Sequence, residues 1–400
     1  MDKIEIINRR RKRFWTINAL CFHVGQLSRK TRDKNIWVFS AWDGMKYADN
    51  SKYLFEFVIK HHPEISCYWQ TRNIDLYHQL IAEGIPTQLI GSKESRSTQR
   101  KAGVAVYTHG VDDFGTVPLV YGAQLVCLWH GASFKKTYRL QLPENRNIVR
   151  QMLGNAKWDF FNYMKQNITV ATSDYSVEFF YRGFRLKNKS GICKAGQARN
   201  DGFSGKQPVS YELLQYIQGR TVILYMPTFR EDNKEILEEI VYLFTNPKIQ
   251  DLLTNNNCVL LCKLHYLVQA NIQSNNNCKL LNDKDVPDVQ QLQLLSDMLI
   301  TDYSGSGIDY ALLRRPIMFY FPDWEQYHAD TTMMPDTKEI CNVNCAWTHN
   351  EFVQRLSEMI ENPERGLKQA EKLNQFFNSE RIPIGEFCEK NFEEITKLLK

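Results

Sequence analysis

The chain has 400 residues, of which 43% are hydrophobic and 24% charged, and its formal net charge is +5. One hydrophobic core rarely organises so long a chain, so two domains are expected, and the composition excludes a largely disordered protein. The ten cysteines are scattered from Cys21 to Cys388, and no second ligand pair lies beside the two pairs with a three-residue gap. This usage favours reduced thiols in the cytosol over a disulfide framework or a structural zinc.

Two basic runs enclose an apolar stretch, 14–24, at the start of the chain. They consist of Arg9, Arg10, Arg11, Lys12 and Arg13, and of Arg29, Lys30, Arg32 and Lys34. The stretch is shorter than the roughly 20 residues that cross a bilayer, and no small-residue cleavage pattern follows, so neither a membrane span nor a signal peptide is expected. Residues 1–34 are interpreted as a basic amphipathic helix on the inner membrane surface or as a solvated helix packed on the first domain. No basic stripe with interleaved aromatics follows, so nucleic acid is not an expected partner.

Short apolar runs alternate with helical patterns from residue 35 onward. Strands are predicted at 35–42, 66–70, 88–91, 103–108, 124–129 and 167–172. Helices are predicted at 53–58, 74–83, 92–101 and 177–181, the last with Ser173 as its N-cap. This alternation is typical of a parallel, doubly wound sheet.

A second series of the same kind begins at Thr221. Strands are predicted at 222–226, 258–263, 298–301 and 316–321, and helices at 234–244, at 288–295, from Ser304, and within 350–400. The predicted fold class is α/β with two Rossmann-like domains, at 35–205 and 206–375, and a C-terminal helix at 376–400. Doubly wound sheets bind ligands at the carboxyl ends of their strands, so the cleft between the domains is the expected active site.

The loop after the strand at 124–129 begins with His130. Gly131 and small residues follow, and they let a phosphate-bearing group approach the backbone. A histidine in this position suits a general base. The alternative is a strand-end histidine satisfied by a backbone carbonyl.

Two further strands end in cationic residues. The strand at 222–226 is followed by Pro227, Thr228 and Arg230. Backbone groups of this segment suit contact with a nucleobase, and the arginine suits a bidentate contact with a diphosphate. Lys263 and His265 lie on one side by alternation, where they can stabilise a leaving phosphate. The alternative for the first segment is a turn with a solvated arginine. The alternative for Lys263 and His265 is that they are polar residues at the rim of the sheet.

The strand at 298–301 leads into a turn rich in serine and glycine. Asp302 follows the strand, and Ser304, Gly305 and Ser306 open a helix. Small residues, hydroxyls and free N–H groups make such a helix start suited to phosphate, although an ordinary serine-capped helix has the same pattern. The spacing is not that of a P-loop or of GxGxxG, which argues against a simple ATPase or dehydrogenase.

Five segments then occur in a fixed order, with the sequences WHGASFKK, AGQARND, MPTFRED, KLH and TDYSGSGIDYALLRRPIMFY. Together they resemble the CDP-glycerol:poly(glycerophosphate) glycerophosphotransferase family, which comprises teichoic-acid primases, polymerases and related capsule enzymes. The resemblance spans residues 37–321. The stretch WDGMKYADNSKYLFEF is similar to the first loop of that family. The resemblance implies a GT-B fold, in which two Rossmann-like domains with parallel sheets face an interdomain cleft.

The resemblance also implies roles for matching residues. His130 matches the base that deprotonates the acceptor hydroxyl, and His265 matches a second catalytic histidine that supports the departing CMP phosphate. The implied donor-binding residues are Pro227, Thr228, Arg230, Lys263, Asp302, Ser304, Gly305 and Ser306. The implied acceptor-side residues are Gly44, Lys46, Tyr47, Asn50, Ser133 and Lys135. Asp201 is expected to have a hinge or structural role, and no metal ligand is implied.

The implied reaction transfers a polyol phosphate from CDP-glycerol or CDP-ribitol to a hydroxyl of a lipid-linked oligosaccharide or polyol-phosphate acceptor, and it releases CMP. No tightly bound cofactor is expected, and Mg²⁺ is neither required nor excluded. The enzyme is expected in the cytoplasm, peripheral to the membrane. Because the chain lacks the added N-terminal domain of long polymerases, a priming or transition step in capsule or teichoic-acid-like polymer synthesis is favoured.

Three alternatives stay open from the sequence. The first is a processive polyol-phosphate polymerase with the same site. The second is a GT-B sugar transferase or a nucleotide-sugar epimerase that uses another nucleotide sugar. The third is a membrane-surface binding module whose working part is the basic N-terminus.

Overall fold

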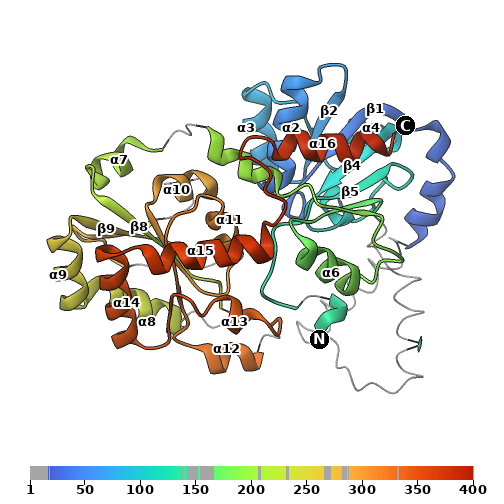
Figure 1. Cartoon of the computed structure of the whole chain (residues 1–400). Coiled ribbons are helices and arrows are strands. Elements are labelled where there is room, and N and C mark those ends of the chain that lie inside the picture. Colours follow the sequence, from blue (N-terminus) through green and yellow to red (C-terminus); the bar gives the residue numbers. More distant parts are fainter. Residues whose placement is uncertain are drawn as a thin grey trace, which may run out of the picture.

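The computed structural model of the chain describes residues 17, 19–136, 138–141, 152–153, 166–205, 209–230, 234–264, 272–281, 286, 288–330 and 333–399. These residues form two α/β units, each built on one sheet (Figure 1). The first sheet has seven strands in the order β3-β2-β1-β4-β5-β6-β7, and the second has six in the order β10-β9-β8-β11-β12-β13. All paired strands within the two sheets are parallel. The predicted α/β class with two Rossmann-like halves is confirmed.

The N-terminal sheet consists of β1 (Asp33–Phe39), β2 (Ser66–Thr71), β3 (Thr87–Leu89), β4 (Ala102–Tyr107), β5 (Gln124–Cys127), β6 (Ile168–Val170) and β7 (Ile192–Cys193). Its helices are α2 (Asp49–His61), α3 (Ile74–Ala82), α4 (Lys93–Lys101) and α6 (Asp174–Gly183). The 3₁₀ segments are η1 (Arg29–Thr31), η2 (Trp42–Gly44), η3 (Val111–Phe114), η4 (Tyr138–Gln141) and η5 (Ala198–Ser204). Strand β4 is buried at every position, as expected for a parallel strand covered on both faces.

The C-terminal sheet consists of β8 (Thr221–Met226), β9 (Cys258–Lys263), β10 (Cys278–Leu281), β11 (Met298–Thr301), β12 (Ile317–Tyr320) and β13 (Cys345–Ala346). Its helices are α7 (Tyr211–Ile217), α8 (Lys234–Thr245), α9 (Pro247–Asn255), α10 (Val289–Leu295), α11 (Ser306–Ala311), α12 (Trp324–Asp330), α13 (Thr337–Ile340), α14 (His349–Glu361) and α15 (Glu364–Phe377). A last helix, α16 (Phe387–Lys397), follows.

Most predicted elements are confirmed, including the cap at Ser173, whose hydroxyl accepts a hydrogen bond from the Ser176 amide. The helix predicted from Ser304 is wrong at its start: α11 begins at Ser306, with Gly305 as its N-cap residue. Sequence patterns missed β7, β10, β13, α7, α9, α12 and α13, because elements of two to nine residues carry little periodic signal. The division at residues 205 and 375 stays a prediction.

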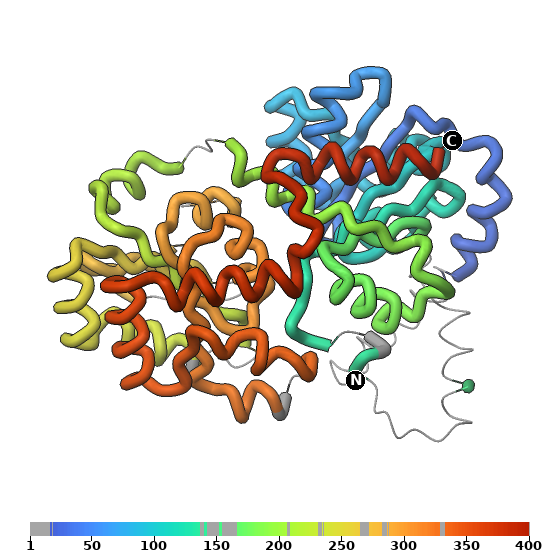
Figure 2. Tube along the Cα trace, viewed as in Figure 1, coloured from blue at the N-terminus to red at the C-terminus, as the bar shows by residue number. Residues whose placement is uncertain are grey.

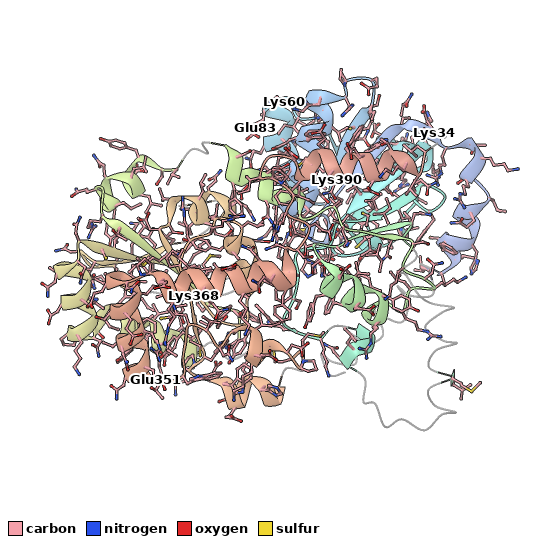
Figure 3. The ribbon with its side chains drawn as sticks, viewed as in Figure 1. Lys34, Lys60, Glu83, Glu351, Lys368 and Lys390 are labelled. Carbon is pink, nitrogen blue, oxygen red and sulfur yellow. The ribbon has the colours of Figure 1, made fainter. Side chains whose placement is uncertain are left out.

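The end of the chain returns to the N-terminal unit. After α15 the backbone crosses between the units, and α16 lies along the N-terminal unit (Figure 2). There the Phe392 ring stacks on Trp37, with 5.5 Å between ring centroids, and Cys388 and Ile395 join the N-terminal core. Lys34, beside the C-terminal end of the chain in Figure 3, donates a hydrogen bond to the Leu399 carbonyl.

The first described segment packs against the N-terminal sheet. Residues 19–26 are helical, and Phe22 contacts Tyr121 edge-to-face with 5.4 Å between ring centroids. Arg32, of the second basic run, donates a hydrogen bond of 3.1 Å to the Leu119 carbonyl. The basic run at 9–13 lies outside the described residues. In the part of the chain that the structure describes, no helix is long and apolar enough to span a bilayer.

Asp201 joins η5 to the start of α16. Its carboxylate accepts hydrogen bonds from the amides of Gly385 (2.9 Å), Phe387 (3.0 Å) and Cys388 (2.7 Å). This geometry satisfies donors at a helix N-terminus that otherwise lack partners.

We expect Asp201→Asn to destabilise the chain by about 1–3 kcal/mol, because an amide has one acceptor oxygen and leaves an amide donor at the helix start without its partner. Urea unfolding measures the change, and Asp251→Asn, at an exposed helical aspartate, is the control. Equal unfolding midpoints for the two variants would contradict the capping role.

Candidate active site

Two histidines stack at the carboxyl ends of neighbouring strands. His109 follows β4 and His130 follows β5, and their rings lie almost parallel, at 10°, with 4.3 Å between centroids. Trp42 covers His109 at 4.6 Å, and Trp129 packs against His130 at 4.1 Å. The sequence predicted His130 at this edge of the sheet but gave no signal for His109, which belongs to no recognised motif.

Both imidazoles are held in the neutral form. Burial, and then the neighbouring His109, lower the pKa of His130 to about 3. Burial also lowers the pKa of His109. The buried Nδ1 atom of His130 makes no hydrogen bond of ordinary geometry within the described residues. A neutral imidazole can accept a proton, although a pKa of about 3 makes His130 a weak base in the free enzyme.

The backbone around the histidines adopts unusual conformations. Trp42, Asp43, Asp49 and Trp129 have φ angles of 52°, 55°, 64° and 55°. Residues other than glycine rarely adopt positive φ, and such conformations persist only where the surrounding structure imposes them. Four of them gather at one edge of the sheet, as is common at functional sites.

Arg199 connects this edge with the C-terminal unit. Its guanidinium pairs with Asp49 at 2.7 Å and with Asp309 of α11 at 2.6 Å, and it donates to the His130 carbonyl at 3.0 Å. Both carboxylates are buried, with side chains 5% and 6% exposed. Burial opposes a charged Arg199, but the charges of Asp309 and Asp49 outweigh it and raise the guanidinium pKa.

Asn50, an expected acceptor-side residue, belongs to the same network. Its amide nitrogen donates to the Trp129 carbonyl at 2.8 Å and to Gln197 at 2.5 Å, and its oxygen accepts from the Arg199 amide at 3.0 Å. Gly131 leaves room for this arrangement, since a Cβ there would lie 2.7 Å from the Arg199 guanidinium. Asn50 therefore holds the histidine loop in place.

The C-terminal unit has its own polar cluster around Arg230. The guanidinium pairs with Asp302 at 2.9 Å and Asp323 at 2.6 Å, and lies 4.5 Å from the centre of the Tyr327 ring. Asp302 also accepts a hydrogen bond of 2.8 Å from the Thr228 amide. Three expected donor-side residues thus meet, but the charge of Arg230 is already balanced by two carboxylates.

The loop at Ser304–Ser306 faces the histidine loop of the other unit. The two hydroxyls lie 2.9 Å apart, and a Cβ on Gly305 would lie 2.8 Å from the Ala132 carbonyl oxygen. Because α11 has only six residues, its dipole is small, and the serine hydroxyls and the narrow contact at Gly305 are the main features of this loop.

The other expected residues have the following positions. Pro227 is buried directly after β8, and Lys263 is buried at the end of β9. His265 lies outside the described residues. The Ser133 hydroxyl accepts from the Lys135 amide at 2.9 Å and shapes the turn.

On the first loop, the Gly44 carbonyl accepts a hydrogen bond from Thr71 at 2.8 Å, and the Lys46 ammonium lies 5.2 Å from the centre of the Trp42 ring. Tyr47 donates to Glu56 at 3.0 Å. These contacts give Gly44 and Tyr47 structural partners, and they leave Lys46 beside the tryptophan that covers His109. Their roles toward an acceptor stay predictions.

Comparison with known proteins supplies the family. Residues 22–381 match the sequence model described as CDP-Glycerol:Poly(glycerophosphate) glycerophosphotransferase. The chain belongs to this family. It is 27% identical over 321 residues to a teichoic acid glycerol-phosphate transferase of Staphylococcus aureus, covering 76% of this chain and 78% of the relative. It is 25% identical over 345 residues to a teichoic acid poly(glycerol phosphate) polymerase of Bacillus spizizenii, covering 81% and 83%.

The fold agrees with this membership. A solved structure of the wall teichoic acid polymerase TagF superimposes with a TM-score of 0.66 at 20% identity, covering 100% of both chains. The likeness confirms the predicted GT-B class. The chain is a CDP-polyol phosphotransferase of this family, so the predicted family and enzyme class are confirmed.

Arg199 offers a direct test of the connection between the two units. We expect Arg199→Met to destabilise the protein by about 3–5 kcal/mol, because two buried carboxylates lose their partner. Arg199→Lys should recover part of the loss, since one ammonium cannot make the forked contacts. Chemical denaturation measures the change, with Arg96→Met at an exposed position as control. A stability equal to that of the control variant would refute the assignment.

Proposed function

We propose that the enzyme transfers glycerol phosphate from CDP-glycerol to a hydroxyl of a lipid-linked acceptor, with His130 as the general base. The observation that carries this proposal is the contact between the two loops. The neutral histidine pair ends the N-terminal sheet, and its loop touches the Ser304–Ser306 loop of the C-terminal unit. A base and a phosphate-compatible loop therefore lie on opposite sides of one interface.

The proposed reaction is a single displacement. The acceptor hydroxyl oxygen attacks the β-phosphorus of CDP-glycerol, the bond from that phosphorus to the oxygen bridging to CMP breaks, and CMP leaves. The hydroxyl proton passes to His130, whose burial keeps it neutral before the step. The charge of Asp49 favours the imidazolium formed, whereas Arg199, 2.7 Å from Asp49, opposes it.

Arg230 is proposed mainly to hold the donor-binding residues around it in place. Among the described residues, four of its five N–H hydrogens are directed to Asp323, Asp302 and the Thr228 carbonyl, which leaves one at Nη1 for a phosphate oxygen. Asp302 in turn fixes the Thr228 hydroxyl and amide. The cluster therefore presents a rigid rim, and the serine loop supplies hydroxyl donors beside it.

The transfer assay measures CMP released from CDP-glycerol and, separately, CDP-ribitol, with lipid-linked acceptors, in the presence of Mg²⁺ or of a chelator. We expect His130→Ala to lower the rate about 10²–10⁴-fold, the usual contribution of general base catalysis. His78→Ala, at an exposed helical histidine, is the matched control and should keep full activity.

Product analysis on a defined primer separates the modes of action. A single addition supports a priming or transition step, and a ladder identifies a polymerase. CMP release from CDP-ribitol alone would show that the donor is CDP-ribitol and not CDP-glycerol. If neither donor releases CMP on any acceptor, the proposed function is wrong.

We further propose that the N-terminal segment rests on an anionic membrane surface. Leu20, Val24 and Leu27 are 64%, 58% and 85% exposed; Leu20 and Val24 lie one turn apart in the helix at 19–26, and Leu27 begins the turn that follows. Arg29 and Lys30, which follow directly, are also exposed. An apolar stripe beside basic residues is the pattern of an interfacial helix.

Vesicle co-sedimentation tests this attachment. We expect the triple change of Leu20, Val24 and Leu27 to Asn to reduce the fraction bound to vesicles rich in anionic lipid severalfold, and salt to weaken binding of the wild type. The double change of Ile74 and Ile81 to Asn, at exposed apolar positions of α3, is the control. Equal binding by both variants would count against the N-terminal surface.

A further inference from the structure

The segment after His130 crosses from one unit to the other. Phe134 is buried in the C-terminal core, where its ring contacts Phe377 at 5.3 Å between centroids, and its carbonyl accepts from the Met334 amide at 2.7 Å. Lys135 forms an isolated backbone bridge with Met333. The lysine therefore starts in the N-terminal unit, but its side chain lies among residues of the C-terminal unit.

The Lys135 ammonium lies 5.2 Å from the centre of the Tyr327 ring. The same ring lies 4.5 Å from the guanidinium carbon of Arg230, so two cations contact one aromatic ring. Asp302 attracts the ammonium, whereas Arg230 repels it. Asp302 is already bonded to Arg230 and Thr228, and Asp323 to Arg230. Within the described residues Lys135 makes no ion pair of its own.

We propose that Lys135 binds the phosphate groups of the nucleotide donor across the interface, and is not an acceptor-side residue. This inference rests on the proposed function. Lys135 is a half-buried ammonium that pairs with no carboxylate of the described residues, beside a cluster whose carboxylates are occupied. It gains a partner when a nucleoside diphosphate enters. Because Lys135 is five residues after His130, the same segment holds the base and the donor-side cation. One loop then positions both the acceptor hydroxyl, through His130, and the donor phosphates, through Lys135.

The surroundings of Lys135 also predict a pH dependence. Burial lowers its pKa to about 8, with Asp302 raising and Arg230 further lowering it. The ammonium is charged below that pH and neutral above it. Donor binding by the free enzyme should therefore weaken as the pH rises through about 8. An arginine at this position keeps its charge across the same range.

Three variants test the assignment: Lys135→Met, Lys135→Arg, and Lys136→Met as the control from the same loop. Calorimetric titration with CDP measures donor-side binding without transfer, at pH 7 and pH 9, and steady-state kinetics separate KM for CDP-glycerol from KM for the acceptor. Thermal melting identifies any variant that does not fold.

We expect Lys135→Met to weaken CDP binding at pH 7 by about 10- to 100-fold, the range of a lost hydrogen bond to a charged group, with the acceptor KM unchanged. Wild-type affinity should fall between pH 7 and pH 9, whereas that of Lys135→Arg should not. Lys136→Met should match the wild type in both respects.

Two results would overturn the inference. One is CDP affinity that is equal in wild type and Lys135→Met, and the other is a rise in the acceptor KM alone. Both differ from failure of the proposed function, in which CDP binds as expected but no CMP is released from either donor.

Discussion

The buried pairing of Arg199 with Asp49 and Asp309 is the constraint on which the site depends. Removing three charges from water is costly, and the pairing offsets this cost only while all three groups stay in place. Asp49 begins the helix beside the histidines, and Asp309 lies in the helix after the serine loop. The position of one unit relative to the other is therefore tied to the conformation of the His130 loop, whose carbonyl the same guanidinium bonds.

The histidine pair follows from this constraint. Arg199 and Asn50 fix the backbone of the His130 loop, and the strained residues Asp49 and Trp129 are held by the same bonds. With the loop fixed, the rings stack, and two imidazolium cations cannot occupy so short a distance without strong repulsion. Burial and mutual proximity thus keep both imidazoles neutral in the free enzyme.

The two units contribute different chemistry. The N-terminal edge is rich in aromatic rings and neutral imidazoles, whereas the C-terminal edge around Arg230 is charged but internally balanced. Because its positive and negative charges cancel, this cluster holds its side chains in fixed positions but attracts an anion only weakly. Among the described residues, the proposed attraction depends on the serine hydroxyls, the remaining Nη1 hydrogen of Arg230 and Lys135. This division explains why a loop of the N-terminal unit reaches across the interface.

The sequence by itself determined the two parallel sheets, since continuous apolar strands and amphipathic helices alternate through both halves. It also determined His130 and the Asp302–Ser306 turn, because the chemistry lies at strand ends. Only the tertiary structure brought in His109, and only it gave Arg199 its partners, 150 and 110 residues away. It also placed the Lys135 side chain among residues of the C-terminal unit, and it balanced the charge of Arg230 with two carboxylates. A pattern along the chain reports local periodicity, whereas charge balance, ring stacking and burial depend on neighbours that only folding supplies.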